Sequence, residues 1–338
     1  MGRLSGVVVG LDNGGTANNA TVMTPDGSFL VDRLVEVPSR ATEGPAAAID
    51  ALVEALDTAL AVASVDRSAV RAVGLDTPGP ASSRGVISSL GSTNFVHPGW
   101  RGFDVRSALE TRLDLPVVYN NDANAAALYA HVRFFGVASD IRSSVAAIVG
   151  TGLGGGVVQS GHLVTGATGM AGELGHVLLP TEGLVEPGQP VPLCNCGQRG
   201  DVESYASLTG IRNNLLPYWL SRYPDHGLHS LDPIRAARAV RGLGERGDEM
   251  ALKIFEQQAR ALGVLFTIAS NFTDPDAYFV GGGVVEAAPA FRDWYLHVVA
   301  DATILRAEQR EAAIFAVVPD LDMAGARGSA IAALAALA

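Results

Sequence analysis

An α/β protein made of two similarly built halves is the fold class that this sequence predicts. Residues 7–27 read VVVGLDNGGTANNATVMTPDG, two apolar runs separated by a glycine pair, and residues 145–161, VAAIVGTGLGGGVVQSG, repeat this design with more glycine. Strand-like runs alternate with helix-like runs in each half, as in layered α/β domains. At 338 residues the chain is long for a single core, so two domains are expected.

The first half is expected to form a sheet with helices packed on it. Apolar runs bounded by turn residues predict strands, and alanine-rich runs with helical apolar spacing predict helices. The expected elements are a strand–turn–strand unit at 7–27, a third strand at 28–38, a helix from Pro45 to 63, a buried strand from 70, a helix at 104–115 and a strand at 116–121 that passes directly into a helix ending at 135.

The second half is expected to repeat this plan from Val145, with a polar loop at about 180–200. The later elements predicted are helices at 205–222, 232–242 and 246–272, a strand, glycine loop and helix over 276–300, and a strand, loop and alanine-rich helix over 315–338. We therefore expect a small α/β domain at 1–124 and a large one at 125–324, with a C-terminal helix (325–338) that packs back on the small domain.

Composition and charge argue against several classes of function. The net charge of −11 disfavours a surface for nucleic acid or an anionic membrane. No apolar run reaches the roughly 18 residues of a membrane helix, and the N-terminal residues do not follow the signal-peptide pattern. The two cysteines, Cys194 and Cys196, are too close for a relaxed disulfide. A soluble, cytoplasmic protein in a reducing compartment is expected.

The second glycine run contains a literal G-x-G-x-x-G at Gly150, Gly152 and Gly155, followed by Glu173. A dinucleotide-binding loop needs a helix to begin there. The chain instead continues with GVVQSGHLVTG, whose paired valines and second turn indicate a β-hairpin. No glycine loop ends in Lys-Ser or Lys-Thr, which excludes a Walker A loop. For either glycine turn alone, an ordinary tight hairpin is the plainer interpretation.

Two glycine turns in matching halves favour a phosphate site. Backbone N–H groups of both turns, together with Thr16 and Thr151, would hold a phosphate chain from two sides. Asp12 ends the first strand beside its turn, where a carboxylate can organise hydrated Mg²⁺. An Asp that only caps the turn is a common alternative.

Asp122, in VVYNNDANAAA, stands where a buried strand meets a helix. A helix N-cap is the plainer interpretation, because Asp and Asn are favoured there. The functional interpretation is a general base, because the carboxyl end of a strand faces the crevice in which α/β proteins bind ligands. Phosphoryl transfer needs one acceptor for the nucleophile's proton, plus donors and Mg²⁺ for the developing charge.

A polar cluster follows the second glycine turn. GMAGELGHV places Glu173 and His176 three residues apart, and CNCGQRGDVES contributes Cys194, Cys196 and Asp201. A histidine, two cysteines and a carboxylate oxygen are donors that structural zinc accepts, although the indication is weaker than that of four cysteines.

Taken in order, these segments resemble the motifs of the ROK family (repressors, open-reading-frame proteins and sugar kinases), which belongs to the actin-like ATPase superfamily. LDNGGT and GTGLGGG are similar to its two phosphate motifs, NNDAN to its catalytic segment, GELGH and CNCGQRGDVE to its sugar and zinc signature, and VGGGV at 280–284 to its adenosine loop. The resemblance implies a two-domain actin-like ATPase (ribonuclease H-like) fold with the active site in the interdomain cleft.

The resemblance also implies an ATP-dependent sugar kinase in which Asp122 takes a proton from a sugar hydroxyl. The residues it implies are Asn94, Asn121, Asp122, Glu173, His176 and Glu203 for the sugar; Asp12, Gly14, Gly15, Thr16, Thr151, Gly152, Gly154, Gly155, Gly281, Gly282 and Gly283 for MgATP; and His176, Cys194, Cys196 and Asp201 for structural Zn²⁺. Two positions depart from the family pattern: Asp201 replaces a zinc cysteine, and Ala17 replaces a lysine.

We expect transfer of the γ-phosphoryl group of MgATP to the 6-hydroxyl of a hexose, with glucose as the first candidate. Another hexose, an amino sugar or a sugar-like cyclitol as acceptor, polyphosphate as donor, and a sugar sensor that does not bind DNA remain alternatives. Repressors of the family carry a helix-turn-helix domain ahead of the core, whereas this chain begins its first strand near Gly6 and is acidic. No nucleic acid or membrane partner is expected, and family members are commonly dimers or tetramers.

Overall fold

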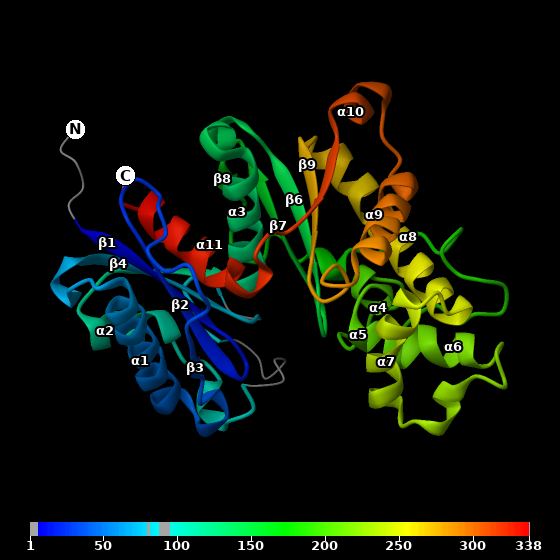
Figure 1. The fold of residues 1–338 in the computed structure, drawn as a ribbon, viewed down its shortest axis with the longest axis horizontal. Coiled ribbons are helices and arrows are strands. Elements are labelled where there is room, and N and C mark those ends of the chain that lie inside the picture. The colour runs from blue at the N-terminus through cyan, green and yellow to red at the C-terminus, as the bar shows by residue number, and fades with distance from the viewer. Residues whose placement is uncertain (1–5, 80–81, 88–94, 338) are drawn as a thin grey trace. The chain divides into compact units, whose positions relative to one another are not determined.

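The computed structural model describes residues 6–79, 82–87 and 95–337, and Asn94 lies outside these residues. The chain divides into two compact units (Figure 1). The first comprises residues 1–139, 162–172 and 319–338, and the second comprises residues 140–161 and 173–318. The segment 125–139, which lies beyond the boundary expected at residue 124, groups with the first unit. Within the described part of the chain, no helix combines the length and apolarity needed to span a membrane.

The first unit is built on a five-stranded sheet of order β3-β2-β1-β4-β5. Its strands are β1 (Val7–Asn13), β2 (Ala17–Met23), β3 (Glu36–Pro38), β4 (Val70–Thr77) and β5 (Val117–Asn121). β1 and β2 form the antiparallel hairpin expected around the first glycine pair, and β4 and β5 continue the sheet in parallel. The expected long third strand at 28–38 is wrong. Only Glu36–Pro38 forms a ladder with β2, and Phe29 forms one bridge with Met23. The alternation of buried and exposed side chains is broken by three consecutive exposed residues at 32–34, and the strand is interrupted there.

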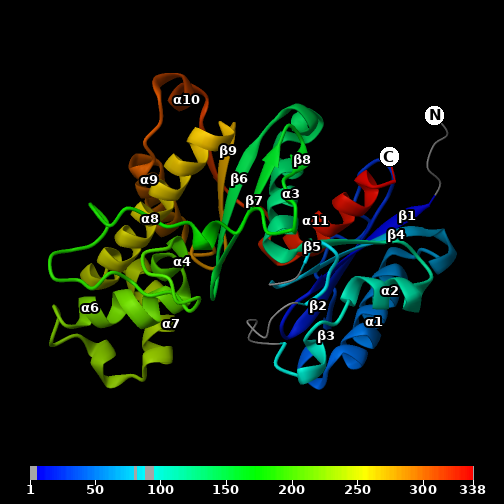
Figure 2. The ribbon, with the colours of Figure 1, turned by 180° about the vertical axis from the view of Figure 1, so that it is seen from behind.

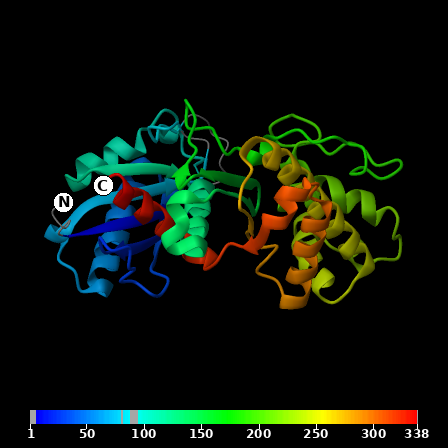
Figure 3. The same cartoon turned by 90° about the horizontal axis from the view of Figure 1, so that it is seen from above.

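The two faces of this sheet pack against different helices. Val9, Leu11 and Leu75 point to a core shared with α1 (Pro45–Ala63) and α2 (Val105–Leu113). The opposite face meets α11 (Leu321–Ala335), which lies beside α3 (Asp122–Phe135) (Figure 3). Alternation along the strands therefore gives the sheet two different faces. The face under α11 has a small apolar cluster around Val8, Met23 and Ala72 and becomes polar toward Asp12 and Asp76.

Helix α11 approaches the strands so closely that two central positions accept only glycine. A Cβ atom at Gly10 of β1 would overlap the carbonyl oxygen of Ala326, and one at Gly74 of β4 would overlap that of Ser329. Gly10 and Gly74 are paired across the two strands. The backbone of α11 therefore packs against both strands at adjacent positions.

The second unit contains a sheet of order β10-β9-β6-β7-β8. Its strands are β6 (Ser144–Val149), β7 (Leu153–Gln159), β8 (His162–Leu163), β9 (Ala277–Gly281) and β10 (Ile314–Val317). β6 and β7 pair antiparallel around Gly150–Gly152, which confirms the hairpin and excludes a dinucleotide-binding loop at the G-x-G-x-x-G sequence. The helices are α4 (Val202–Tyr205), α5 (Leu208–Gly210), α6 (Leu216–Leu220), α7 (Pro233–Glu245), α8 (Glu249–Thr273), α9 (Pro289–Ala302) and α10 (Ala307–Ala312).

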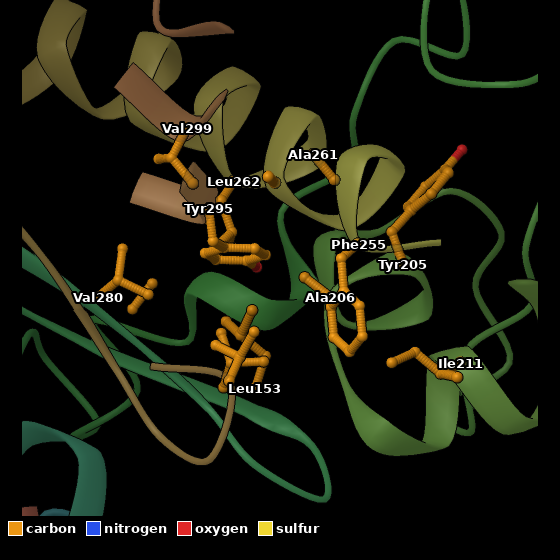
Figure 4. Packing of buried hydrophobic residues seen from close by; sticks show 14 of the residues in the cluster. Leu153, Tyr205, Ala206, Ile211, Phe255, Ala261, Leu262, Val280, Tyr295 and Val299 are labelled. Carbon is orange, nitrogen blue, oxygen red and sulfur yellow. The ribbon is translucent and has the colours of Figure 1, made fainter. Parts of the chain in front are cut away.

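The core of the second unit lies between its sheet and its helices. Phe255 and Leu262 of α8 and Tyr295 of α9 belong to one cluster with Leu153 and other side chains of the strands (Figure 4). Figure 2 shows the ribbon of α8 and of the strands from behind. The helix expected at 205–222 is divided into α4, α5, a π-helical turn at Ile211–Leu215 and α6. The Ser207 side chain caps α5 and starts a new turn there, which accounts for part of this division.

The close packing of α11 on Gly10 and Gly74 leads to a first prediction. Gly74→Ala would force the helix away from β4, and overpacking of this kind costs about 3 kcal/mol of unfolding free energy. We expect a markedly lower Tm in differential scanning calorimetry. Gly227→Ala is the control, because a Cβ there meets no atom within 4 Å. Equal melting of the two variants would contradict the tight packing of α11.

Candidate active site and metal centre

The first glycine turn is fixed by the segment that follows β3. Ser39 donates from its backbone N–H to the Thr16 carbonyl (3.0 Å) and from Oγ to the Gly15 carbonyl (3.1 Å). Gly14 and Gly15 are half-buried and Thr16 is exposed. Asp12, at the end of β1, is half-buried, and its Oδ2 accepts from Asn19 Nδ2 at 3.4 Å. The predicted phosphate residues of this unit thus lie on one ordered hairpin.

Asp122 is not the cap of helix α3. That role belongs to Asn121, whose Oδ1 accepts from the backbone N–H groups of Ala123 (3.0 Å) and Asn124 (3.4 Å). Asp122 is the first helical residue, half-buried, with its Oδ1 2.7 Å from the Ala123 nitrogen. The positive end of the helix dipole stabilises a carboxylate in this position. The plainer interpretation of Asp122 as an N-cap is therefore wrong.

The buried carboxylate of Asp76 was not predicted from the sequence. Asp76 lies opposite Asp12 in the parallel pairing of β4 with β1 and is completely buried. Burial raises the pKa of both carboxyl groups, and the charge of Asp12 raises that of Asp76 further. The available signal was the tetrapeptide VGLD, which occurs at 9–12 and again at 73–76.

The second glycine turn and the glycine loop after β9 lie together in the second unit. Leu208 and Thr209 at the start of α5 donate to the Gly150 carbonyl (3.0 Å) and the Thr151 carbonyl (3.1 Å). Gly282, with a φ of 94°, lies directly against the carbonyl of Val149, where a Cβ would not fit. The residues predicted for the nucleotide in this unit, Thr151, Gly152, Gly154, Gly155, Gly281, Gly282 and Gly283, are thereby grouped around the ends of β6 and β9.

Glu203 connects the second glycine turn to the cysteine loop. Its Oε2 accepts from the Leu153 backbone N–H at 2.9 Å, and its Oε1 accepts from Cys194 Sγ at 3.4 Å. Glu173 is exposed, and its carbonyl accepts from the His176 N–H at 3.1 Å in a 3₁₀ turn. The predicted sugar residues Glu173, His176 and Glu203 thus belong to the second unit, whereas Asn121 and Asp122 belong to the first.

The four predicted metal ligands converge. One donor atom from each of His176, Cys194, Cys196 and Asp201 lies within 4.8 Å of the others, a spacing that fits a four-coordinate zinc ion. Asp201 Oδ2 is 3.2 Å from His176 Nδ1 and 3.4 Å from Cys196 Sγ. Asp201 Oδ1 accepts from the Ser204 N–H (3.0 Å) as the cap of α4, which orients the carboxylate toward the cluster. Burial raises the pKa of the Cys194 thiol, so a metal must displace its proton.

The chain matches known proteins along nearly its whole length. A sequence model of the ROK family matches residues 8–336. A glucokinase of Halalkalibacterium halodurans is 31% identical over 286 residues, which cover 82% of this chain and 81% of that protein. A ROK hexokinase structure from Thermus thermophilus is 33% identical with a TM-score of 0.76, covering 98% of this chain and 99% of that one. A ROK glucokinase structure from Streptomyces griseus in complex with glucose and AMPPNP is 28% identical with a TM-score of 0.70, at 97% and 99% coverage.

The two roles of Asp201 can be separated. With a chelator present, Asp201→Ala removes the cap of α4 and should lower the unfolding free energy by about 1–2 kcal/mol. Asp201→Asn keeps an oxygen for the Ser204 N–H and should stay close to the parent protein. Thermal melts of the three proteins measure this, and equal losses in both variants would disprove the capping role.

Proposed function

The chain belongs to the ROK family, and from this premise we propose that it is an ATP-dependent hexose kinase that phosphorylates the 6-hydroxyl of glucose. The observation that carries the proposal is Asp122, a carboxylate at the N-terminus of α3 whose capping role is taken by Asn121. The similarity to a glucokinase and a ROK hexokinase supports the choice of a hexose.

Asp122 acts as the general base. It accepts the proton of the sugar hydroxyl as that oxygen attacks the γ-phosphorus, while the bond from this phosphorus to the oxygen of ADP breaks. Backbone N–H groups of the turns at Gly14–Thr16 and Thr151–Gly152 hold phosphate oxygens, with the hydroxyls of Thr16 and Thr151. Asp12 would hold the hydration shell of Mg²⁺, and the ion would supply positive charge to the phosphates during transfer. Gly281, Gly282 and Gly283 are proposed for the adenosine on the family resemblance.

The sugar hydroxyls are held by carboxylate, amide and imidazole groups. Glu173, His176 and Glu203 provide them in the second unit, and Asn121 provides one in the first. Asn94 is proposed on the family resemblance alone. Groups of this kind favour a polyol because each accepts or donates directed hydrogen bonds to hydroxyls.

Structural Zn²⁺ is proposed at His176, Cys194, Cys196 and Asp201. The cysteines and the histidine suit zinc, and the carboxylate of Asp201 completes four donors. A metal at this place would tie the cysteine loop to the start of α4, the helix that carries Glu203. The zinc would thus support the sugar site and take no part in phosphoryl transfer. Oligomeric state and cytoplasmic location stay predictions.

The test of the reaction is a coupled ADP-release assay on Asp122→Asn. We expect turnover to fall by about 10²- to 10⁴-fold, since a general base contributes on that order, while glucose binding measured by calorimetry stays within a few-fold. Asp114→Asn is the control, because Asp114 is exposed in a left-handed backbone conformation that Asn tolerates. An Asp122→Asn enzyme with most of its activity would remove Asp122 from this role.

The same assay identifies the substrates. Glucose, mannose, fructose, N-acetylglucosamine, N-acetylmannosamine, allose and a cyclitol are compared as acceptors, and ATP is compared with polyphosphate as donor. Turnover highest with glucose and ATP is expected. A higher kcat/KM for another acceptor would replace glucose in the proposal, and glucose binding without turnover on any pair would indicate a sensor.

Metal analysis tests the zinc proposal. Protein purified without chelators should contain about one zinc per chain, and Cys196→Ala should contain almost none. Cys196 is exposed, so its loss leaves the core intact. His297→Ala is the control, because His297 is an exposed histidine of the same unit that is not one of the four proposed ligands. This variant should bind zinc as the parent does. Zinc-free parent protein would refute this assignment without affecting the kinase proposal.

A further inference from the structure

The face of the first sheet that meets α11 carries an unusual group of polar side chains. Asp12 and Asp76 lie side by side at the carboxyl ends of β1 and β4, within hydrogen-bond reach of each other. Both residues contact α11. Ser329 Oγ donates to Asp76 Oδ2 at 2.7 Å, and Gly325 lies against Asp12, so that a Cβ there would stand 2.9 Å from the carboxyl group.

This group contains more buried oxygens than donors. Asp76 Oδ1 has no hydrogen-bond partner, although Asp76 is completely buried. Thr21 Oγ1, in a residue 2% exposed, and Asn19 Oδ1 are also buried without partners, and β2 presents both residues to the same face as Asp12. Buried polar atoms in folded proteins almost always have a partner. We therefore expect a further proton, ion or water to bind these oxygens.

A proton shared between the two carboxyl groups would satisfy only part of this group. It would pair Asp12 with Asp76, but Asn19 Oδ1 and Thr21 Oγ1 would remain without partners. A divalent cation neutralises two adjacent carboxylates and, through its bound waters, reaches further oxygens. Asp12 is half-buried and lies beside the completely buried Asp76, so an ion held by Asp12 would also meet Asp76.

We propose that Asp12 and Asp76 together form a divalent-cation site that binds Mg²⁺ directly and before the nucleotide arrives. The proposal rests on the proposed function for the choice of Mg²⁺, and it goes further, because there Asp12 alone orients a hydrated ion delivered with ATP. Asp76 becomes a ligand of the ion, and Ser329 holds its carboxylate in place. The first unit then presents a bound cation beside the first glycine turn before any phosphate is present.

The experiment titrates Mn²⁺, a spectroscopic substitute for Mg²⁺, into zinc-loaded protein without nucleotide or sugar. Free Mn²⁺ is measured by electron paramagnetic resonance. The parent protein should bind Mn²⁺, and Asp76→Asn should weaken this binding by about 10- to 100-fold or more. The amide oxygen of Asn still accepts from Ser329, so the fold should persist, which circular dichroism checks. Asp32→Asn, an exposed position of the same unit, should bind Mn²⁺ as the parent does.

Two outcomes would overturn the site. A parent protein that binds no Mn²⁺ without nucleotide would remove the cation from this site, and this result does not depend on any variant folding. Equal Mn²⁺ affinity in the parent and Asp76→Asn would show that Asp76 is not a ligand. The ADP-release assay is independent of both: a parent that phosphorylates glucose but binds no Mn²⁺ alone would lose only this proposal.

Discussion

The close packing of helix α11 on strands β1 and β4 is the contact on which the first unit depends. At Gly10 and Gly74 the helix backbone lies directly against the strands. From this helix the side chain of Ser329 donates a hydrogen bond to Asp76. Without this approach the polar ends of β1 and β4 would face water, and their carboxyl groups would lose the burial that raises their pKa. The packing of one helix therefore determines the electrostatics beside the first glycine turn.

In the second unit, the residues around the second glycine turn are positioned by polar side chains that each have two partners. Asp201 caps α4 with one oxygen and faces the metal donors with the other, and Glu203 joins the Leu153 N–H to Cys194. Since each carboxylate links two segments, the cysteine loop, α4 and the second glycine turn are positioned together. Asp201, at the position where the family resemblance implies a cysteine, thus offers an oxygen to the metal donors and also caps a helix.

The sequence predicted the elements whose signal is local. Alternating apolar runs around glycines gave both hairpins, and alanine-rich runs with helical spacing gave α1, α3 and α11. It failed where the structure depends on partners distant in the chain. The pairing of Asp12 with Asp76 exists only once β1 and β4 are in register. The expected third strand is interrupted at residues 32–34, whose side chains are all exposed. The cap on α3 was likewise a choice between Asn121 and Asp122 that only backbone geometry decides.

The position of α11 in the chain has a consequence for synthesis on the ribosome. The first unit takes its sheet from the beginning of the chain and its closing helix from residues 321–335, whereas the second unit is complete by residue 318. The second unit can therefore finish folding while the sheet of the first is still without its closing helix. Gly10, Gly74 and Asp76 stay uncovered until residues 321–335 have been synthesised, and exposed surface of this kind favours aggregation.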